Sequence, residues 1–388
     1  MFALRVRMGF PRNIFKQLFS FSYMHYHIIL TEVCNLKCKY CYEKSMIEFD
    51  NGLEEKWDYE ENIPFDSEVS IERLKKFLKP TDTLIFYGGE PLVRIDKMKE
   101  IMDNVDCRFC IQTNGIFLDK VPFEYIKRLD KMLVSIDGTR ERDVENKGAL
   151  HYDKAISNVR MLREKGYTGE IVARMVISKP DVYEQVMAIL DLGLFDSIHW
   201  QIDAGFYKND FDGEEFSKFV EEYNVSIDRL LDWWFENLSA VRRTPNCGKK
   251  GHKLYPFVGI LNRIKDWDKE TRLPCGAGYA NFTINTKGDL SACPIMNSVK
   301  NFYCGSVDKG VKKEIDCGNW CESCSHRDIC GGRCLYSNYA QLWPKEGHDL
   351  ICKTIKHLID GIRERSEGLE LDAKDFEYEK YFGPEIIP

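Results

Sequence analysis

The sequence lacks the features of membrane, exported and nucleic-acid-binding proteins. No apolar run approaches the ~18 residues of a membrane span, and the N-terminal stretch has no compact apolar core followed by a small-residue cleavage site. The net charge of −7 gives no reason to expect a nucleic-acid partner. None of the eight histidines stands in a ligand-like pair. We therefore expect a cytoplasmic protein with neither a membrane nor a nucleic-acid partner.

Cysteine, in contrast, is abundant and unevenly placed. Ten of the 15 cysteines fall between Cys247 and Cys352. Without an export signal the compartment is reducing, so clustered cysteines indicate bound metal rather than disulfides. Cys107 and Cys110 are an exception, because they lie on a predicted buried strand and are expected to be small core residues.

Short apolar segments alternate with helical patterns over the first 240 residues. Predicted strands lie at 26–31, 83–89, 108–115, 131–138, 170–178 and 197–203, and predicted helices at 70–79, 153–166, 181–192 and 216–238. Repeated strand–helix units imply an α/β fold with a parallel sheet, and about six strands imply an open, partial (β/α)6 TIM-like barrel. After Cys247 the chain is rich in Cys and Gly, with a hairpin expected around Lys287 and Gly288.

The predicted organisation has four parts. They are an extension over 1–24, the barrel over 25–240, a cysteine-rich domain over 241–352, and a C-terminal helix with an acidic tail over 353–388. The cysteine-rich domain has little apolar sequence, so bound metal is expected to hold it together. The stretches 43–62 and 366–388 are expected to be solvated surface.

Residues with functional groups follow the predicted strands, where the chemistry of such barrels takes place. These residues are the three-cysteine loop after the first strand, 88–91 after the second, 112–115 after the third, Ser135 and Asp137 after the fourth, and Gln201 and Asp203 after the sixth. Asp203 and Gln201 lie at the end of the barrel where chemistry is expected. They could serve as a base or a substrate ligand, or contact a cofactor at the rim.

The three-cysteine loop carries Cys34, Cys38 and Cys41. Three thiolates are one too few for a structural zinc site and an odd number for disulfides. They match three corners of a cubane iron–sulfur cluster in which one iron is left open for a substrate or cosubstrate. The alternatives are buried structural cysteines or an incomplete zinc site.

This pattern resembles the radical S-adenosylmethionine (SAM) superfamily. The resemblance rests on Cys-x3-Cys-x2-Cys with Tyr40 before the last cysteine, followed by Gly88, Gly89, Glu90 and Pro91. It implies that SAM chelates the open iron and that one electron cleaves SAM to methionine and a 5′-deoxyadenosyl radical, which takes a hydrogen atom from the substrate. An electron donor such as ferredoxin or flavodoxin is then an expected partner.

The same resemblance implies a set of SAM contacts. The Gly88–Pro91 turn brings bare backbone and the Glu90 carboxylate up to the methionine ammonium. Asn114, Ser135 and Asp137 resemble the polar groups around the SAM carboxylate and ribose. The cation that pairs with the SAM carboxylate is left open between Lys147 and Arg174.

The C-terminal cysteines resemble the SPASM domain, which binds two auxiliary 4Fe–4S clusters and brings the expected total to three. The resemblance implies that Cys275, Cys293 and Cys334 ligate the first auxiliary cluster, and that Cys321, Cys324, Cys330 and Cys352 ligate the second. Cys247 is the expected fourth ligand of the first cluster, with Cys304, Cys317 or an open iron as alternatives. By spacing alone, Cys321 to Cys334 could also be a zinc ribbon.

The SPASM branch mostly modifies peptides and proteins, so the expected function is a two-electron oxidation of a peptide side chain, such as a crosslink or a thioether. Sulfatase-maturing relatives carry an aspartate where this chain has Pro294, so formylglycine formation is not expected. An extended peptide is expected to pair with the open edge of the barrel. The alternatives are an oxidoreductase for a small molecule or cofactor precursor, and a non-catalytic zinc-binding module.

Overall fold

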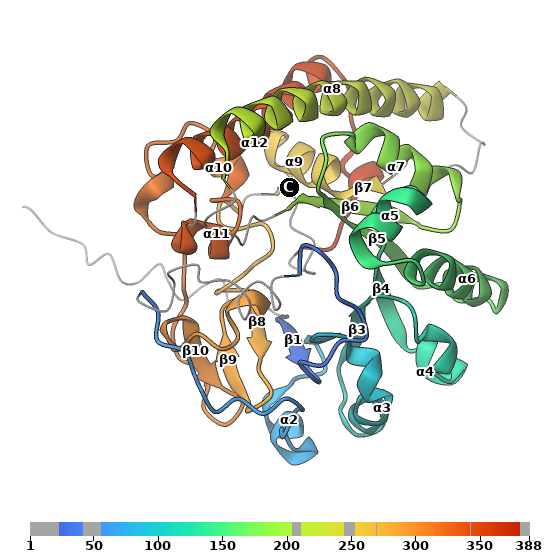
Figure 1. Ribbon diagram of the computed structural model, residues 1–388, viewed down its shortest axis with the longest axis vertical. Helices are drawn as coiled ribbons and strands as arrows, with labels where there is room; N and C mark the ends of the chain where they lie inside the picture. Colours follow the sequence, from blue (N-terminus) through green and yellow to red (C-terminus); the bar gives the residue numbers. More distant parts are fainter. Residues whose placement is uncertain are drawn as a thin grey trace, which may run out of the picture.

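The computed structural model describes residues 23–41, 56–203, 211–243, 253–268, 270–341 and 343–380. Six parallel strands pair in chain order and curve into an arc (Figure 1). They are β1 (His25–Ile29), β2 (Thr83–Tyr87), β3 (Arg108–Thr113), β4 (Leu129–Ser135), β5 (Glu170–Ile177) and β6 (Ser197–Ile202). Each pair is parallel. The predicted partial α/β barrel is confirmed.

Helices cover the convex face of this arc (Figure 1). They are α2 (Ile71–Phe77), η2 (Pro91–Arg94), α3 (Ile95–Asn104), η3 (Leu118–Lys120), α4 (Phe123–Ile126), α5 (Arg140–Lys147), α6 (His151–Glu164) and α7 (Val182–Asp191). Ser70 caps α2 by accepting a hydrogen bond from the Arg73 amide. Helix α6 buries Ile156, Val159 and Leu162 as the 3.6-residue pattern predicts. The helical period of the sequence therefore accounts for the face that this helix packs against the sheet.

The cysteine-rich region extends the same sheet. Strand β8 (Asn281–Ile284) pairs in parallel with β1, and β9 (Asp289–Ser291), β10 (Tyr303–Ser306) and β11 (Gly310–Val311) follow antiparallel. The hairpin predicted around Lys287 and Gly288 is confirmed, since it joins β8 to β9 and Gly288 has φ +100°. Its pairing with β1 was not expected. Strand β8 occupies the β1 edge of the sheet, so an extended peptide cannot pair with the barrel at this edge in the way that was expected.

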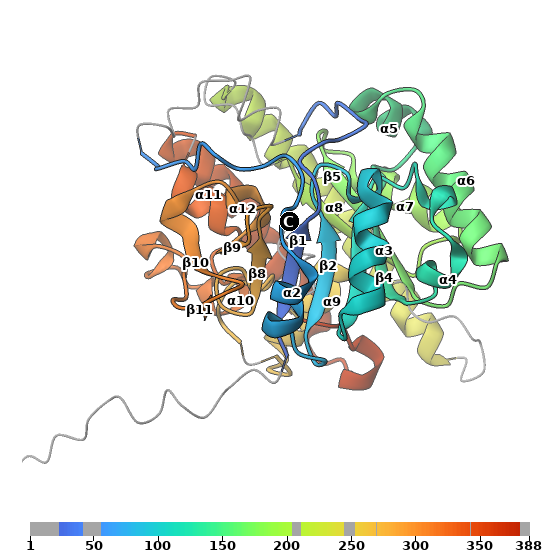
Figure 2. The same ribbon diagram turned by 90° about the horizontal axis from the view of Figure 1, so that it is seen from below.

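The other edge is partly covered. Strand β7 (Lys253–Leu254) pairs with Ser197 and Ile198 at the start of β6. Helix α9 (Tyr255–Ile264) follows it, and the remaining short elements are η4 (Pro294–Met296), η5 (Lys300–Phe302), η6 (Asn319–Cys321), α10 (Arg327–Cys330) and α11 (Leu335–Ala340). Figure 2 shows β9, β10, α10 and α11 of the cysteine-rich region on the side of β1 away from β2.

The cysteine-rich region shares the apolar core of the barrel. Leu273, Phe282 and Leu290 lie in the same buried cluster as Ile28 and Phe86. This differs from the expectation that bound metal alone would hold the region together. The sequence pattern gave no sign of this core because the apolar residues are scattered among turns and show no helical or strand period.

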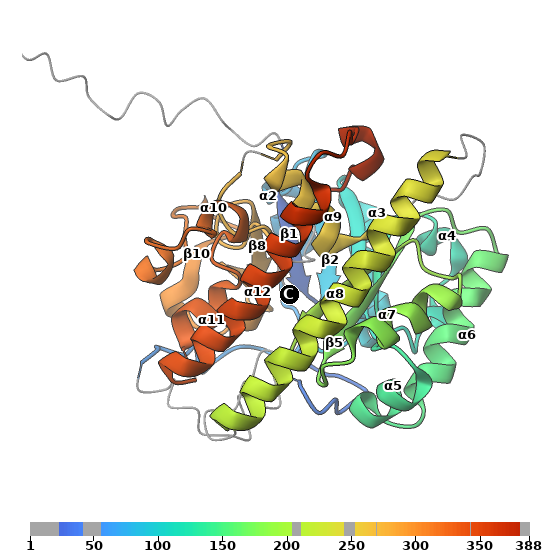
Figure 3. The same cartoon turned by 90° about the horizontal axis from the view of Figure 1, so that it is seen from above.

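Two long helices, α8 (Gly213–Arg243) and α12 (Lys345–Ser366), cross the outside of the barrel side by side (Figure 3). Leu358 and Ile362 of α12 share a buried cluster with Ile227 and Leu230 of α8. No helix of the described residues is long and apolar enough to cross a membrane.

The chain after α12 packs against the barrel, contrary to the expected solvated tail. The 3-10 helix η7 (Ala373–Phe376) buries Phe376 against Trp234, with ring centroids 6.0 Å apart. Glu379 reaches the amino ends of the strands, where it contacts Arg108. In the other stretch expected to be surface, Trp57 is buried, while residues 42–55 and 381–388 lie outside the described part.

Candidate active site

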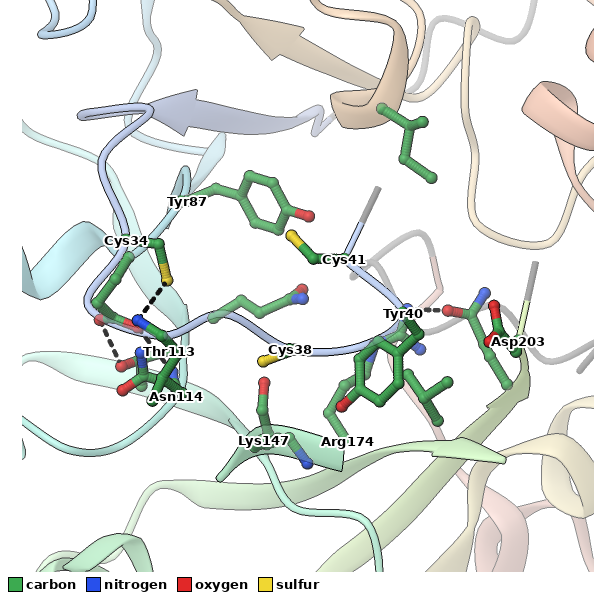
Figure 4. Close-up of a pocket in the computed structure, with 18 of the residues that line it drawn as sticks. Cys34, Cys38, Tyr40, Cys41, Tyr87, Thr113, Asn114, Lys147, Arg174 and Asp203 are labelled. Atoms are coloured by element: carbon green, nitrogen blue, oxygen red, sulfur yellow. Dashed lines mark hydrogen bonds between the residues drawn. The ribbon is translucent and has the colours of Figure 1, made fainter. Parts of the chain in front are cut away.

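One pocket gathers the residues predicted at the carboxyl ends of the strands (Figure 4). Its wall on the barrel side contains Cys34, Cys38, Tyr40, Cys41, Tyr87, Gly88, Gly89, Glu90, Gln112, Thr113, Asn114, Ser135, Lys147, Arg174, Gln201 and Asp203. The cysteine-rich region supplies Ile295, Arg333, Cys334 and Ser337. Of the predicted contacts, Pro91 and Asp137 do not line the pocket, and Cys247 lies outside the described residues.

The cysteine loop is held to its neighbours through the backbone. The Glu90 amide donates to the Val33 carbonyl at 3.0 Å, and the Lys39 amide donates to the Asn146 carbonyl at 2.9 Å. Cys34, Cys38 and Cys41 lie around a shared space (Figure 4). Within the described residues, no three His, Cys, Asp or Glu side chains are placed to hold a single metal ion. Three thiols around a space fit a cubane, because each of its thiolates binds a different iron.

The two glycines after β2 allow the cysteine loop to approach closely. A Cβ added at Gly88 would lie 2.2 Å from the Thr31 carbonyl oxygen, and one at Gly89 would lie 2.6 Å from the Glu32 carbonyl oxygen. Gly88 also has φ +141°, which side chains rarely adopt. Only glycine therefore fits at these positions, and the turn and the start of the loop form one wall.

Glu90 joins this turn to the end of β3. Its Oε1 accepts from the Thr113 hydroxyl at 2.7 Å and the Leu92 amide at 3.0 Å, and its Oε2 accepts from the Asn114 amide at 2.7 Å. Burial raises the pKa of Glu90, and these three donors oppose the rise. The carboxylate therefore organises the pocket wall, a role that its place in the sequence did not predict.

Asp137 stands behind the wall and is fully buried. Its Oδ2 accepts from the Tyr40 hydroxyl at 2.7 Å and the Asn146 amide group at 2.9 Å, and it pairs with Lys147 at 2.6 Å. Its Oδ1 accepts from the Val176 amide at 3.0 Å. Asp137 therefore fastens Tyr40, the residue before Cys41, to the barrel.

A second buried carboxylate, Asp143, completes this network. It accepts from Lys147 at 2.9 Å and lies 2.5 Å from Nδ1 of His151, whose Nε2 lies 2.8 Å from the Asn114 carbonyl oxygen. Both nitrogens of His151 face acceptors, so its ring joins Asp143 to Asn114. Lys147 pairs with both buried carboxylates, because a fully buried charge requires a partner.

The charges in the network act on one another. Burial alone would lower the pKa of Lys147, but Asp137 and Asp143 outweigh it and the pKa is raised. Burial alone would raise the pKa of Asp143, but Lys147 and His151 lower it. Sequence reasoning missed Asp143 and His151. The available signal was the spacing of four residues between Asp143 and Lys147, which places an acid and a base on one face of a helix. His151 begins the next helix, so this spacing did not indicate it.

The far side of the pocket carries Arg174 on β5. Its Nη2 donates to Oε1 of Gln201 at 2.5 Å, and its Nη1 contacts His199. Gln201 therefore orients Arg174, and Asp203 follows on the rim at the end of β6.

The C-terminal cysteines form two groups. Desolvation raises the pKa of Cys330 to about 12, with Cys352 and Cys321 adding to the rise, and Cys324 acts in the same way on Cys321. The resemblance assigns these four to the second auxiliary cluster, and that assignment stays a prediction. Cys275, Cys293 and Cys334 instead pack with the cluster that contains β1 to β4.

Residues 28–193 match the family model of the radical SAM superfamily. Residues 28–193 of this chain therefore form a radical SAM domain, as the motifs predicted. Proteins of this superfamily bind SAM and a 4Fe–4S cluster, which fits the cysteine loop described above.

Curated relatives with different named activities resemble the chain. It is 30% identical to Fe-coproporphyrin III synthase of Methanosarcina barkeri over 42% of this chain and 39% of that protein. It is 22% identical to the radical SAM cyclopropyl synthase TigE of Paramaledivibacter caminithermalis over 86% and 73%. It is 30% identical to an S-adenosylmethionine-dependent nucleotide dehydratase of a Fibrobacter species over 67% and 66%.

Two solved structures share the fold over most of the chain. Native anSMEcpe with bound AdoMet and the Cp18Cys peptide has a TM-score of 0.61 at 15% identity, covering 88% of this chain and 97% of that one. Streptococcus suis SuiB bound to the precursor peptide SuiA has a TM-score of 0.51 at 15% identity, covering 82% and 72%. The shared span includes the cysteine-rich region as well as the barrel.

Proposed function

We propose that this chain cleaves SAM reductively and uses the resulting radical to oxidise a side chain of a peptide or protein, with loss of two hydrogens. The observation that carries the proposal is the pocket, which the cysteine loop, the Gly88–Glu90 turn and Cys334 of the cysteine-rich region all line. Binding of a peptide is supported by the shared fold, since both solved neighbours hold peptides.

Each group of residues in the pocket has its own proposed role. Cys34, Cys38 and Cys41 hold the cluster, and the Gly88–Glu90 turn receives the methionine end of SAM. Arg174 is the better partner for the SAM carboxylate, because Lys147 already pairs with Asp137 and Asp143 inside the fold. When bound, the cluster and SAM supply a strongly oxidising carbon radical.

The substrate would lie between the barrel rim and the cysteine-rich region. Asp203 stands on the rim of the same pocket and can take a proton from the oxidised substrate. The cysteine-rich region would hold two further 4Fe–4S clusters, one on Cys321, Cys324, Cys330 and Cys352 and one on Cys275, Cys293 and Cys334. The substrate would lose a hydrogen atom to the 5′-deoxyadenosyl radical, a proton to Asp203 and its second electron to one of these clusters. An electron donor such as ferredoxin or flavodoxin completes the set of partners.

The proposal is tested by anaerobic incubation with SAM, a low-potential reductant and candidate peptides from neighbouring reading frames. We expect a peptide about two mass units lighter, and deuterium from the labelled peptide in 5′-deoxyadenosine. Reconstituted protein should hold about twelve irons per chain, four for each cubane. Iron near four with stoichiometric zinc would contradict the auxiliary sites and favour a zinc-binding region.

The second candidate is oxidation of a small molecule or cofactor precursor. It is favoured by the names of two relatives, an Fe-coproporphyrin III synthase and a nucleotide dehydratase. Label that reaches 5′-deoxyadenosine from a small metabolite and from no peptide would establish this alternative.

A further inference from the structure

The first proposed auxiliary site has three ligands and an unassigned fourth position. Its three cysteines come from separate segments: Cys275 precedes β8, Cys293 follows β9, and Cys334 precedes α11. The sequence offers Cys247, Cys304 and Cys317 for the fourth place. Cys247 lies outside the described residues, but the surroundings of the other two can be compared.

The segment that carries Cys317 runs beside the segment that carries Cys275. The Ile315 amide donates to the Gly278 carbonyl at 2.9 Å. A Cβ added at Gly278 would lie 2.2 Å from the Ile315 carbonyl oxygen, so only glycine permits this approach. Cys317 therefore lies two residues after a segment that packs against the turn following Cys275.

The loop before Cys334 closes on the same two segments. Sγ of Cys317 lies 3.8 Å from the Gly332 carbonyl oxygen, and a Cβ at Gly332 would lie 2.7 Å from that sulfur. A Cβ at Gly331 would lie 2.2 Å from the Arg272 carbonyl oxygen. Gly331 has φ +67° and Gly332 has φ +100°, so the chain bends tightly around the Cys317 thiol.

Helix α11 fastens these segments together. It begins directly after Cys334. Its Tyr339 hydroxyl donates to the Asp316 carbonyl at 2.8 Å, and Asn338 accepts from the Gly318 amide at 2.8 Å. Two hydrogen bonds that flank Cys317 therefore come from the helix that Cys334 opens.

Cys304 has different neighbours. It is buried on β10 with its sulfur 3.6 Å from the Phe302 carbonyl oxygen. Cys304 belongs to the buried core, whereas the Cys317 sulfur lies against Gly332, two residues before Cys334.

We infer that Cys317 is the fourth ligand of the first auxiliary cluster, beside Cys275, Cys293 and Cys334, an assignment that rests on the proposed function. Within the described residues no group of side chains is placed to hold a single ion, and four thiols from converging segments suit a cubane. A cluster with four protein thiolates has no iron for a substrate to bind. Its role is electron transfer, at a place where Cys334 reaches the active-site pocket.

The experiment starts from a variant in which Cys34, Cys38 and Cys41 are alanine, so that only auxiliary clusters form. This parent should hold about eight irons per chain and give no 3Fe–4S electron paramagnetic resonance signal after mild ferricyanide oxidation. Adding Cys317→Ala should expose one iron, so that oxidation yields about one 3Fe–4S cluster per chain. Adding Cys304→Ala instead, as the matched control, should leave the parent spectrum unchanged.

Three results would overturn the assignment. If the parent already gives a 3Fe–4S signal that Cys317→Ala does not change, one auxiliary iron has no protein ligand, and Cys317 is not the fourth ligand. A signal created by Cys247→Ala and not by Cys317→Ala assigns the position to Cys247. A parent with no more than about four irons removes an auxiliary cluster itself, and with it the proposed function on which the assignment rests.

Cys317→Ser covers the case in which the alanine variant does not fold. A serine oxygen can replace the thiolate, so the cluster should keep four irons while one of them becomes distinct in the Mössbauer spectrum, in a ratio of about three to one. Two auxiliary clusters with unchanged iron sites in the serine variant would contradict ligation by Cys317.

Discussion

Both ends of the barrel bury charged side chains, but the two ends are built differently. At the carboxyl ends of the strands, Asp137, Asp143, Lys147 and His151 come from one stretch of 15 residues. They hold Tyr40 and Asn114 in place behind the pocket. This network supports the wall of the candidate active site.

At the amino ends, the charges come from distant parts of the chain. Lys131 of β4 pairs with Glu170 of β5 at 3.2 Å and with Glu379 of the C-terminal segment at 2.7 Å. Arg108 of β3 also pairs with Glu379, at 2.6 Å. This cluster lies at the base of the barrel, at the ends of the strands opposite the cysteine loop.

The comparison shows that buried charge has two uses in one fold. Near the pocket it sets the position of groups that line the candidate active site, and at the base it joins strands to the end of the chain. Variants of the first cluster should therefore change cofactor binding, whereas variants of the second should change stability alone.

The largest effect should come from removing the thiols of the pocket end. Replacing Cys34, Cys38 and Cys41 by alanine should reduce reductive cleavage of SAM to background, because no cluster can form there, while the iron of the auxiliary sites remains. The measurement is 5′-deoxyadenosine by chromatography, with iron analysis in parallel. The matched control is Cys110→Ala inside the barrel, which should lower stability by about 1 kcal/mol and leave SAM cleavage intact. Persistent cleavage in the triple variant would contradict the site.

Lys147→Met should destabilise the protein by about 3–5 kcal/mol, because it leaves Asp137 and Asp143 buried with too little positive charge. Denaturant unfolding measures the loss, and SAM affinity should fall with it because Asp137, which accepts the hydrogen bond of Tyr40, loses its cation. Lys154→Met, which removes a half-exposed ion pair with Asp119, is the control and should cost less than about 1 kcal/mol. Equal effects of the two variants would mean that the network is unimportant.

Glu379→Gln should cost about 1–3 kcal/mol and leave SAM affinity unchanged. Burial would raise the pKa of Glu379, but His25, Lys131 and Arg108 outweigh it and the pKa is lowered. A lowered pKa in the folded state means that this stability is present above the unfolded value of about 4.3 and is lost as the pH falls below it. The difference between wild type and variant should therefore shrink in acid.

The same unfolding series should include Glu377→Gln, since Glu377 is an exposed residue of the same segment. This control should lie within about 0.5 kcal/mol of wild type at every pH. A change in SAM affinity in Glu379→Gln would break the distinction between the two ends of the barrel.

The smallest effect is expected for Glu90→Gln. An amide nitrogen would replace one carboxylate oxygen and face a hydrogen-bond donor, so one of three hydrogen bonds is lost. SAM should bind about tenfold more weakly, which corresponds to about 1.4 kcal/mol, as measured by calorimetry on the anaerobic protein. Glu100→Gln on the exposed face of α3 is the control. An affinity equal to that of wild type would remove Glu90 from the SAM site.

Much of the barrel and its pocket could be predicted from the sequence. Strands and helices show local periods, and the strand ends of a parallel barrel meet, so Cys34, Glu90, Ser135 and Gln201 could be placed together from periodicity and motifs alone. Partners could not be predicted in this way. Asp137 was expected to meet the cofactor, yet it holds Tyr40, Asn146 and Lys147 inside the fold.

The sequence by itself determined the candidate chemistry, which is cluster and SAM binding. The spacing of Cys34, Cys38 and Cys41 and the two glycines before Glu90 are local features that can be read without knowing the fold. Only the tertiary structure decided which distant segments meet: β8 beside β1, Glu379 beneath the barrel and Cys317 beside the loop before Cys334. The physical reason is that periodicity and turn chemistry act over a few residues, whereas these contacts depend on the packing of the whole core.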